Sequence, residues 1–139
     1  MKKPILLFFM AVGCILTSCK SDDSGDDGDL LGTWSYIAYV DSEGEELAND
    51  CESMDILRFK DGNILDYELH STDSTSGDCI EGTHDSGSWT YLFNGKVQLD
   101  YGTDGNSDIT VAKYKVSGDI LTLTINEGNG EYQEKFKKK

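Results

Sequence analysis

The chain has 139 residues and carries a formal net charge of −14 at pH 7, from 26 acidic and 12 basic residues. This balance argues against nucleic acid as a partner, and against anionic membrane surfaces as a binding mode, because both are themselves negative. It favours basic or cationic partners instead. The length allows one domain with one modest hydrophobic core.

Residues 1–18 have the pattern of an export signal. Lys2 and Lys3 give a positive start, and the apolar stretch 4–16 has signal-peptide length but is too short to cross a bilayer as a helix. Small residues then lead to a cysteine in the sequence LTSC, which ends at Cys19. Such a boundary suits a peptidase that tolerates little bulk at its cleavage site.

The LTSC sequence resembles the lipobox of bacterial lipoproteins. The resemblance implies that Cys19 becomes the first residue, is acylated on its sulfur and its amine, and anchors the chain in the membrane. Several acyl chains give a durable anchor, whereas a single chain holds only marginally. The alternative is an ordinary signal peptide with a chance cysteine.

Residues 19–29 are expected to form a disordered acidic tether. The segment KSDDSGDDGD contains five aspartates and no apolar side chain, so it cannot bury enough surface to offset its ordering entropy. An acidic cluster directly after a lipidated cysteine also resembles the export tag of surface lipoproteins in Bacteroidota-type bacteria. That resemblance implies a protein of the outer membrane that is exposed on the cell surface; the periplasmic face is the other possibility.

Residues 30–139 are predicted to form one all-β domain. Alternating apolar runs suggest eight strands, at 32–40, 54–60, 63–70, 87–93, 96–101, 109–116, 119–125 and 131–137. Asp61-Gly62, Asn94-Gly95 and Ser117-Gly118 suit tight hairpins. Eight consecutive antiparallel strands with short links predict an up-and-down β-barrel.

The remaining links, 41–53, 71–86, 102–108 and 126–130, are the longer ones. Alternate links of a meander lie at opposite ends, so the long links should form an open rim while the tight turns close the other end. The first strand starts at the closed end. The open end is therefore expected to face away from the membrane.

Two cysteines belong to the domain, Cys51 and Cys79. Cys14 leaves with the signal, and Cys19 is assigned to lipid. An exported protein meets an oxidising compartment, so a disulfide between the remaining two is expected, and both lie in long links at the open end. No C-x-x-C motif occurs, which leaves thiol-redox catalysis and a cysteine zinc site without support.

The segment LLGTW, with Gly32 and Trp34, carries the Gly-x-Trp signature of lipocalins. Together with LRFKDGNI, GSWTY and the two cysteines, in this order, it resembles the small lipocalin-like domains of Bacteroidota-type lipoproteins. The resemblance implies an eight-stranded barrel that binds an apolar small molecule and has no catalytic residues. Trp34 should plug the barrel floor, and a basic side chain of the last strand, Lys135 or Lys137, is the candidate to cover it.

A barrel of eight strands is either filled by its own side chains or holds one small ligand, and the sequence leaves both open. If the barrel is hollow, the candidate ligand-lining residues are Tyr36, Phe59, Tyr67, Tyr91 and Tyr114.

The sequence carries no motif of enzyme chemistry. Gly-x-Ser-x-Gly, His-Glu-x-x-His and P-loop patterns are all missing. His70 and His84 lie near acidic residues of one long link, where solvated side chains are favoured over a metal site. A non-catalytic monomer without cofactor or metal is expected.

Two functions are consistent with these features of the sequence. The first is a lipid-anchored module that binds a small apolar or cationic molecule in the barrel. The alternative is a protein-interaction module, inhibitor or adhesin-like, that docks a basic protein on its acidic rim. The rim acids are Asp41, Glu43, Glu45, Glu46, Asp50, Glu52, Asp73, Asp78, Glu81, Asp85, Asp104 and Glu127. Such a mouth should repel anions such as free fatty acids.

Overall fold

The computed structural model describes residues 30–103 and 105–139. The expected signal, the lipidation site Cys19 and the tether therefore lie outside the described residues. Within the described part, no helix has the length and apolar character that crossing a membrane requires.

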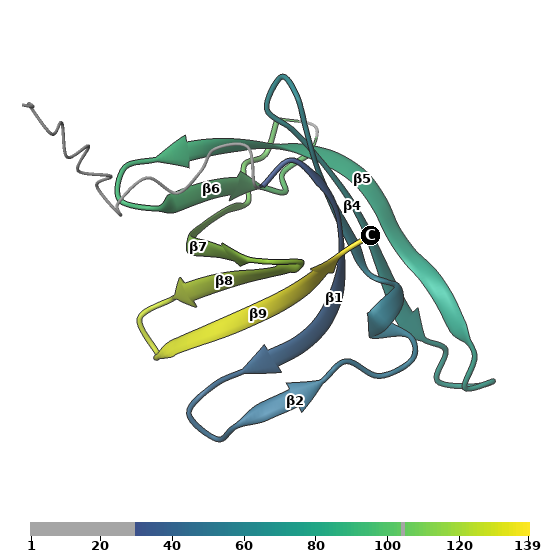
Figure 1. Cartoon of the computed structure of the whole chain (residues 1–139). Coiled ribbons are helices and arrows are strands. Elements are labelled where there is room, and N and C mark those ends of the chain that lie inside the picture. Colours follow the sequence, from purple (N-terminus) through teal and green to yellow (C-terminus); the bar gives the residue numbers. More distant parts are fainter. Residues whose placement is uncertain (1–29, 104) are drawn as a thin grey trace, which may run out of the picture.

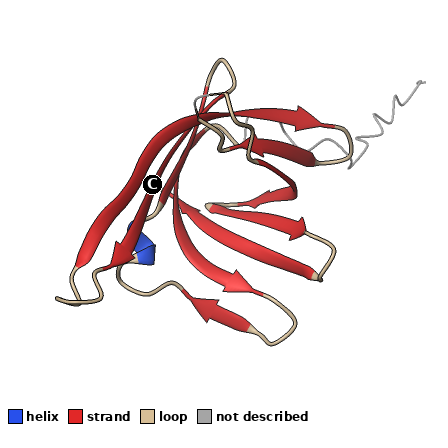
Figure 2. Cartoon of the chain, turned by 180° about the vertical axis from the view of Figure 1, so that it is seen from behind, coloured by secondary structure: helices blue, strands red, loops and turns tan. Residues whose placement is uncertain are grey.

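The described chain forms one antiparallel sheet that closes on itself (Figure 1). Figure 2 shows the same barrel from behind, with a short helix beside the strands. The elements are β1 (Gly32–Val40), β2 (Glu45–Leu47), the 3₁₀ helix η1 (Glu52–Met54), β3 (Ile56–Lys60), β4 (Ile64–Thr72), β5 (Cys79–Leu92), β6 (Lys96–Asp100), β7 (Ile109–Ser117), β8 (Ile120–Asn126) and β9 (Glu131–Lys138).

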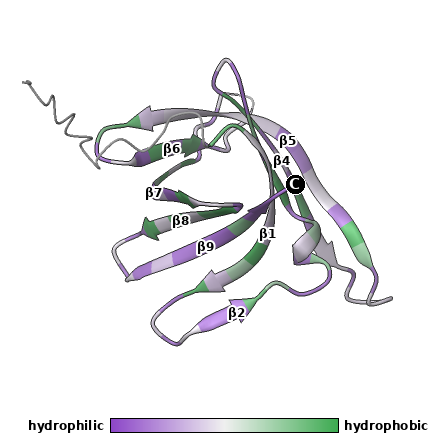
Figure 3. Cartoon of the chain, viewed as in Figure 1, coloured by the Kyte–Doolittle hydropathy of each residue, from purple (hydrophilic) through white to green (hydrophobic). Residues whose placement is uncertain are grey.

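Eight of these strands make the barrel, which confirms the predicted fold class. From β3 to β9 each strand pairs with the next, β1 pairs with β3, and pairing of β1 with β9 closes the ring, with Tyr36 opposite Phe136. The remaining strand, β2, pairs with β1 near Val40; it is exposed, and two of its three residues are glutamates (Figure 3). It lies within the first long link.

Period-two alternation explains the barrel wall. In β8, Leu121, Leu123 and Ile125 are buried, while Thr122 and Thr124 between them are only partly buried. The same alternation in the other strands fills the closed half of the barrel with a continuous core. Its largest fully buried side chains are Trp34, Phe59, Leu30, Leu65, Leu99, Leu121, Leu123 and Val97.

The hairpin of β4 and β5 is longer than predicted. The sequence pattern suggests a link over residues 71–86, but pairing continues to Thr72 opposite Cys79, which leaves only 73–78 as the turn. The first eight residues of β5 are all exposed. Because both faces of this part of the strand meet solvent, its residues show no apolar alternation, and the sequence pattern could not reveal it.

The first long link is also more ordered than predicted. It contains η1 at 52–54, a segment that the sequence pattern assigns partly to the second strand. The side-chain oxygen of Asn49 accepts hydrogen bonds from the backbone N–H groups of Cys51 and Glu52, each at 2.9 Å. This local bonding fixes the start of the short helix.

The closed end is built around Trp34, which is fully buried. Its Nε1 donates a hydrogen bond to the carbonyl oxygen of Leu30 at 2.8 Å. Gly32 has a φ of 133°, a conformation that side chains rarely adopt, which explains glycine at this position of the signature. The Nζ atom of Lys138 lies 5.1 Å from the centroid of the Trp34 ring.

Lys138 therefore covers the tryptophan, and not Lys135 or Lys137. Trp34 lies opposite Lys138 in the register of β1 and β9, and Lys138 shares a strand face with the buried Phe136. The odd-numbered lysines point to the other face. Lys135 forms an ion pair with Glu45 there, and the Lys137 Nζ lies 3.7 Å from an oxygen of Asp119.

The predicted disulfide is confirmed: Cys51 and Cys79 are bonded, with their Cα atoms 5.3 Å apart. Cys51 directly precedes η1, and Cys79 begins β5. The bond thus joins the first long link to the hairpin of β4 and β5, called the projecting hairpin below, at the open end.

Candidate ligand-binding cavity

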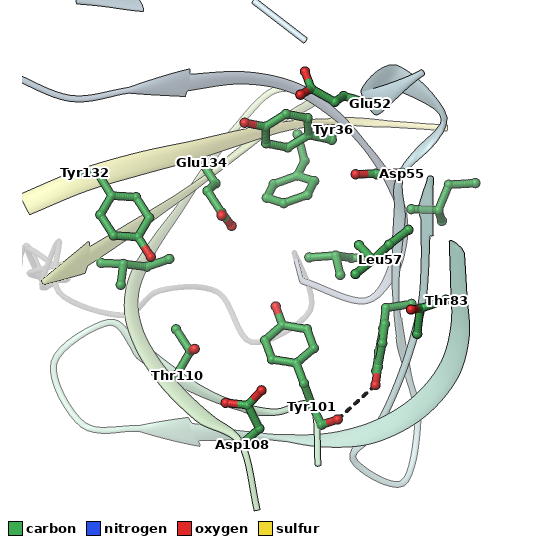
Figure 4. A pocket seen from close by; sticks show the side chains of 15 residues that line it. Tyr36, Glu52, Asp55, Leu57, Thr83, Tyr101, Asp108, Thr110, Tyr132 and Glu134 are labelled. Carbon is green, nitrogen blue, oxygen red and sulfur yellow. Dashed lines mark hydrogen bonds between the residues drawn. The ribbon is translucent and has the colours of Figure 1, made fainter. Parts of the chain in front are cut away.

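The open half of the barrel contains a cavity of about 580 Å³ (Figure 4). Residues from η1 and the position after it, from the long link between β6 and β7, and from seven of the barrel strands line it. They are Tyr36, Glu52, Asp55, Ile56, Leu57, Tyr67, Leu69, Thr83, Tyr101, Asp108, Thr110, Ile125, Tyr132, Glu134 and Phe136. The barrel is thus filled at its closed end and hollow at its open end.

Aromatic contacts hold the walls of the cavity in place. The Tyr67 hydroxyl donates a hydrogen bond to the carbonyl oxygen of Tyr101 at 2.9 Å, and the two rings meet edge to face at 5.2 Å. Across the barrel seam, Tyr36 contacts Phe136 edge to face at 5.5 Å. These contacts preorganise an aromatic surface.

Two of the five predicted lining residues, Tyr36 and Tyr67, do line the cavity. The other three, Phe59, Tyr91 and Tyr114, do not. They belong to an aromatic cluster toward the closed end, in which Phe59 lies 5.6 Å from Trp89, Trp89 lies 4.8 Å from Tyr91, and Tyr91 lies 5.8 Å from Tyr114. Alternation indicates that a side chain faces inward, but not its height along the barrel axis.

The sequence does not single out Tyr101, Tyr132 and Glu134 as lining residues. The sequence pattern puts Tyr101 at the end of the strand predicted over 96–101, in phase with the buried Val97 and Leu99, whereas β6 ends at Asp100 and Tyr101 begins the link that follows. A signal for Glu134 is present, because it lies between Tyr132 and Phe136 on the inward face of one strand. A glutamate at the middle position of an inward-facing triplet is the pattern that could have identified it.

Two cavity carboxylates are held by backbone donors. An oxygen of Asp55 accepts a hydrogen bond from the N–H of His70 at 2.6 Å, and an oxygen of Glu52 accepts one from the N–H of Asn49 at 3.0 Å. Burial raises the pKa of the Asp55 carboxyl, and the backbone hydrogen bond from His70, together with the nearby His70 ring, opposes that rise. Both groups thus have a structural role at the cavity edge.

Glu134 differs from these two. Its carboxylate points into the cavity (Figure 4), and within residues 30–103 and 105–139 its side chain has no hydrogen bond or ion pair. Burial raises the pKa of its carboxyl, and the negative charge of Glu127 adds to the rise. No lysine, arginine or histidine is among the residues that line the cavity.

The cavity tyrosines remain neutral at physiological pH. The pKa of Tyr36 is raised to about 12, mainly by burial. The pKa of Tyr132 is also raised to about 12, for the same reason. The pKa of Tyr101 is raised as well, again mainly by burial. Their hydroxyl groups can therefore donate hydrogen bonds as well as accept them.

The two histidines lie on the long hairpin. His70 is on β4, with its Nδ1 3.4 Å from Asp55, and His84 is on β5, 3.7 Å from both Glu68 and Glu81. Among the described residues, no group of three or more His, Cys, Asp or Glu side chains is arranged to hold a metal ion.

Comparison with known proteins agrees with the barrel and its sequence signature. A family model described as a lipocalin-like domain matches residues 30–112, which is more than half of the chain. A search of curated proteins found no match. The family is generally one of non-catalytic binding proteins. The closed eight-stranded barrel, the hollow open end and this match lead to one conclusion: the chain belongs to the lipocalin-like domain family.

Proposed function

We propose that this protein is a lipid-anchored module of the bacterial outer membrane that binds a small molecule with an apolar body inside its barrel. The observation that carries the proposal is the open cavity of about 580 Å³. Ligand pockets commonly have about 300–1,000 Å³ and combine apolar and aromatic walls with a few polar groups. The cavity wall of this barrel has that composition.

The charge of the cavity narrows the choice of ligand. Its polar groups are carboxylates, tyrosine hydroxyls and the hydroxyls of two threonines, and the surrounding loops are rich in acids. An anionic ligand such as a fatty acid would meet like charge there. A neutral or cationic molecule is favoured.

The proposed anchor is the lipid on Cys19, on the basis of the LTSC sequence. The acidic segment after it supports surface display in the manner of Bacteroidota-type lipoproteins. β1 starts beside Trp34 at the closed end, so the tether joins the barrel opposite the cavity mouth. The cavity would then open away from the membrane.

Binding is tested with 1-aminoanthracene, a neutral apolar fluorophore, titrated into the unlipidated Cys19→Ala protein. Thr110 lines the cavity, whereas its neighbour Val111 is 42% exposed on the outer face of the same strand. The Thr110→Trp variant should abolish the fluorescence increase because the new ring fills the cavity. The matched Val111→Trp variant should retain it. Equal binding by both variants, or no binding by the parent protein, would refute the proposal.

The anchor is tested separately by membrane fractionation. The Cys19→Ala variant should move from the membrane fraction to the soluble fraction, because the acyl chains supply the membrane affinity. Retention of this variant in the membrane would refute lipid anchoring without affecting the binding proposal.

Docking of a basic protein on the acidic rim is the second candidate. Leu47, 71% exposed, and Met54, 51% exposed, lie in the same link as many of the rim acids, and such a mixed surface suits a protein interface. Lysozyme is a suitable basic probe. Micromolar binding that is lost in the Leu47→Asp variant but kept in Thr110→Trp would favour this function over binding in the barrel.

A further inference from the structure

We propose that the ligand of the cavity is an organic cation, with an ammonium or amidinium group on an apolar body, and that the Glu134 carboxylate binds its charge. The inference rests on the proposed function, because it specifies the ligand class of the same cavity.

The charge of the cavity is unbalanced. Its lining contains four carboxylates and no basic side chain. Asp55 and Glu52 accept hydrogen bonds from backbone amides, but Glu134 has no partner in the described part of the chain. The nearest base in sequence, Lys135, points to the opposite face of the strand and pairs with Glu45.

An ionised carboxylate without a partner is costly when protein atoms displace its water. Glu134 has no structural role that would account for this cost, since it bonds to no neighbour that the structure describes. A cationic ligand would supply both the missing counter-charge and the missing hydrogen-bond donors.

Aromatic side chains surround the space into which this carboxylate points. Tyr36, Tyr101 and Tyr132 converge on the same space as Glu134 (Figure 4). The negative charge of Glu134 contributes to the raised pKa of each of these three tyrosines, which reports their closeness to it. Tyrosine rings attract cations through their π faces, most strongly where water is displaced.

Tyr101 points to a ligand independently of the acids. Protein atoms surround its side chain almost completely, yet its hydroxyl faces the cavity (Figure 4) and has no hydrogen-bond partner within the described residues. The residue is partly buried and lines the open cavity. A hydroxyl that has no partner in the protein and faces an open cavity is accounted for by a polar group that occupies that cavity.

The test uses three probes of matched shape: 2-naphthylmethylammonium, neutral 2-naphthylmethanol and anionic 2-naphthoate. Each is titrated calorimetrically into the Cys19→Ala protein at pH 7.5 and low salt. The cation should bind at least about tenfold more tightly than the neutral alcohol, a difference of about 1.4 kcal/mol, and the anion more weakly than both.

The Glu134→Gln variant should reduce the ratio of cation to neutral affinity to about one while leaving the neutral probe within about twofold of its original affinity. The control is Glu131→Gln, which removes an exposed acid from the same strand and should preserve the ratio. Retained binding of the neutral probe also shows that each variant is folded.

The outcomes separate the two proposals. Neutral and cationic probes of equal affinity, or an unchanged ratio in Glu134→Gln, would overturn the cation inference and leave small-molecule binding in place. Failure of all three probes to bind would overturn both.

Discussion

At the level of single residues, the floor of the barrel depends on a few side chains in close contact. Trp34 is buried completely and bonded to the carbonyl oxygen of Leu30, and Lys138 lies over its ring. The glycine at 32 has a positive φ, and a Cβ there would come within 3.2 Å of the Lys138 side chain. The signature glycine, the tryptophan and the lysine thus act as one structural unit.

The Lys138→Met variant tests this unit. It keeps most of the apolar stem but loses the cation over the ring, so the free energy of unfolding in urea should fall by about 1 kcal/mol. The control, Lys137→Met, removes an exposed lysine whose Nζ lies 3.7 Å from Asp119, and it should cost less than about 0.5 kcal/mol. Equal losses in the two variants would show that the contact with Trp34 adds no stability.

Glu134 gives a prediction on the pH dependence of stability. Its pKa in the folded protein is raised from the ordinary 4.5, so the folded state binds this proton more tightly than the unfolded state. Stability should therefore fall as pH rises from the ordinary value through the folded pKa. The groups that face it are acids and neutral tyrosines, which do not reverse this sign: Glu127, Asp108, Tyr36, Tyr101 and Tyr132.

The Glu134→Gln variant should consequently be more stable than the parent protein at pH 7.5, and its advantage should disappear below about pH 4, where both side chains are neutral. Urea unfolding over a pH series measures this difference. A parent protein that is the more stable of the two at pH 7.5 would mean that the carboxylate has a stabilising partner.

At the level of elements, the disulfide links two segments at the open end of the barrel. It joins the start of η1 to the start of β5 and so fixes the segment that carries Glu52 at the cavity edge. The two cysteines are 28 positions apart in sequence. In the chain-entropy account, a bond across such a loop stabilises a protein by about 3.5 kcal/mol.

The Cys51→Ala/Cys79→Ala double variant should lose about that free energy of unfolding, measured in urea without reductant. Treating the parent protein with reductant before unfolding should reproduce most of the loss. An unchanged unfolding midpoint in the double variant would show that the first long link is held by its other contacts alone.

The close approach of β5 to the end of β6 depends on Gly87. A Cβ at this position would lie 1.9 Å from the carbonyl oxygen of Asp100, a backbone atom that cannot move without disturbing the barrel. The Gly87→Ala variant should therefore lose about 2 kcal/mol or more. The control, Gly82→Ala in the projecting hairpin, places its Cβ 3.3 Å from a backbone oxygen and should cost clearly less. A Gly87→Ala variant with the same free energy of unfolding as the parent protein would refute the requirement for glycine.

At the level of the whole molecule, local sequence patterns are sufficient to predict the fold. Tight turns at Asp61-Gly62 and Asn94-Gly95, with period-two alternation in the strands between them, predicted eight antiparallel strands in the order that the barrel shows. These patterns mispredict the strand boundaries where a strand extends beyond the core. The polar start of β5 after Cys79 has solvent on both faces and therefore no apolar alternation.

The candidate site is harder to predict from the sequence than the fold, because it depends on how deep each inward-facing side chain lies along the barrel axis. Tyr67 and Tyr91 both face inward, yet one lines the cavity and the other packs toward the closed end. Depth is set by strand register and barrel tilt, which bring together residues far apart in sequence, such as Tyr36 and Tyr132. Alternation places Glu134 on the inward face between Tyr132 and Phe136, but this position becomes a candidate binding site only because the interior beside it is hollow.

The central claim is that the hollow half of the barrel holds a small molecule. The most direct measurement is a ¹⁵N–¹H NMR titration of the Cys19→Ala protein with neutral 2-naphthylmethanol. Saturable amide shifts should concentrate at cavity positions such as Leu57, Tyr101 and Thr110, while the exposed turn residue Phe93 at the closed end should not shift. Shifts confined to outer-face residues, or no saturable shift at all, would contradict the claim.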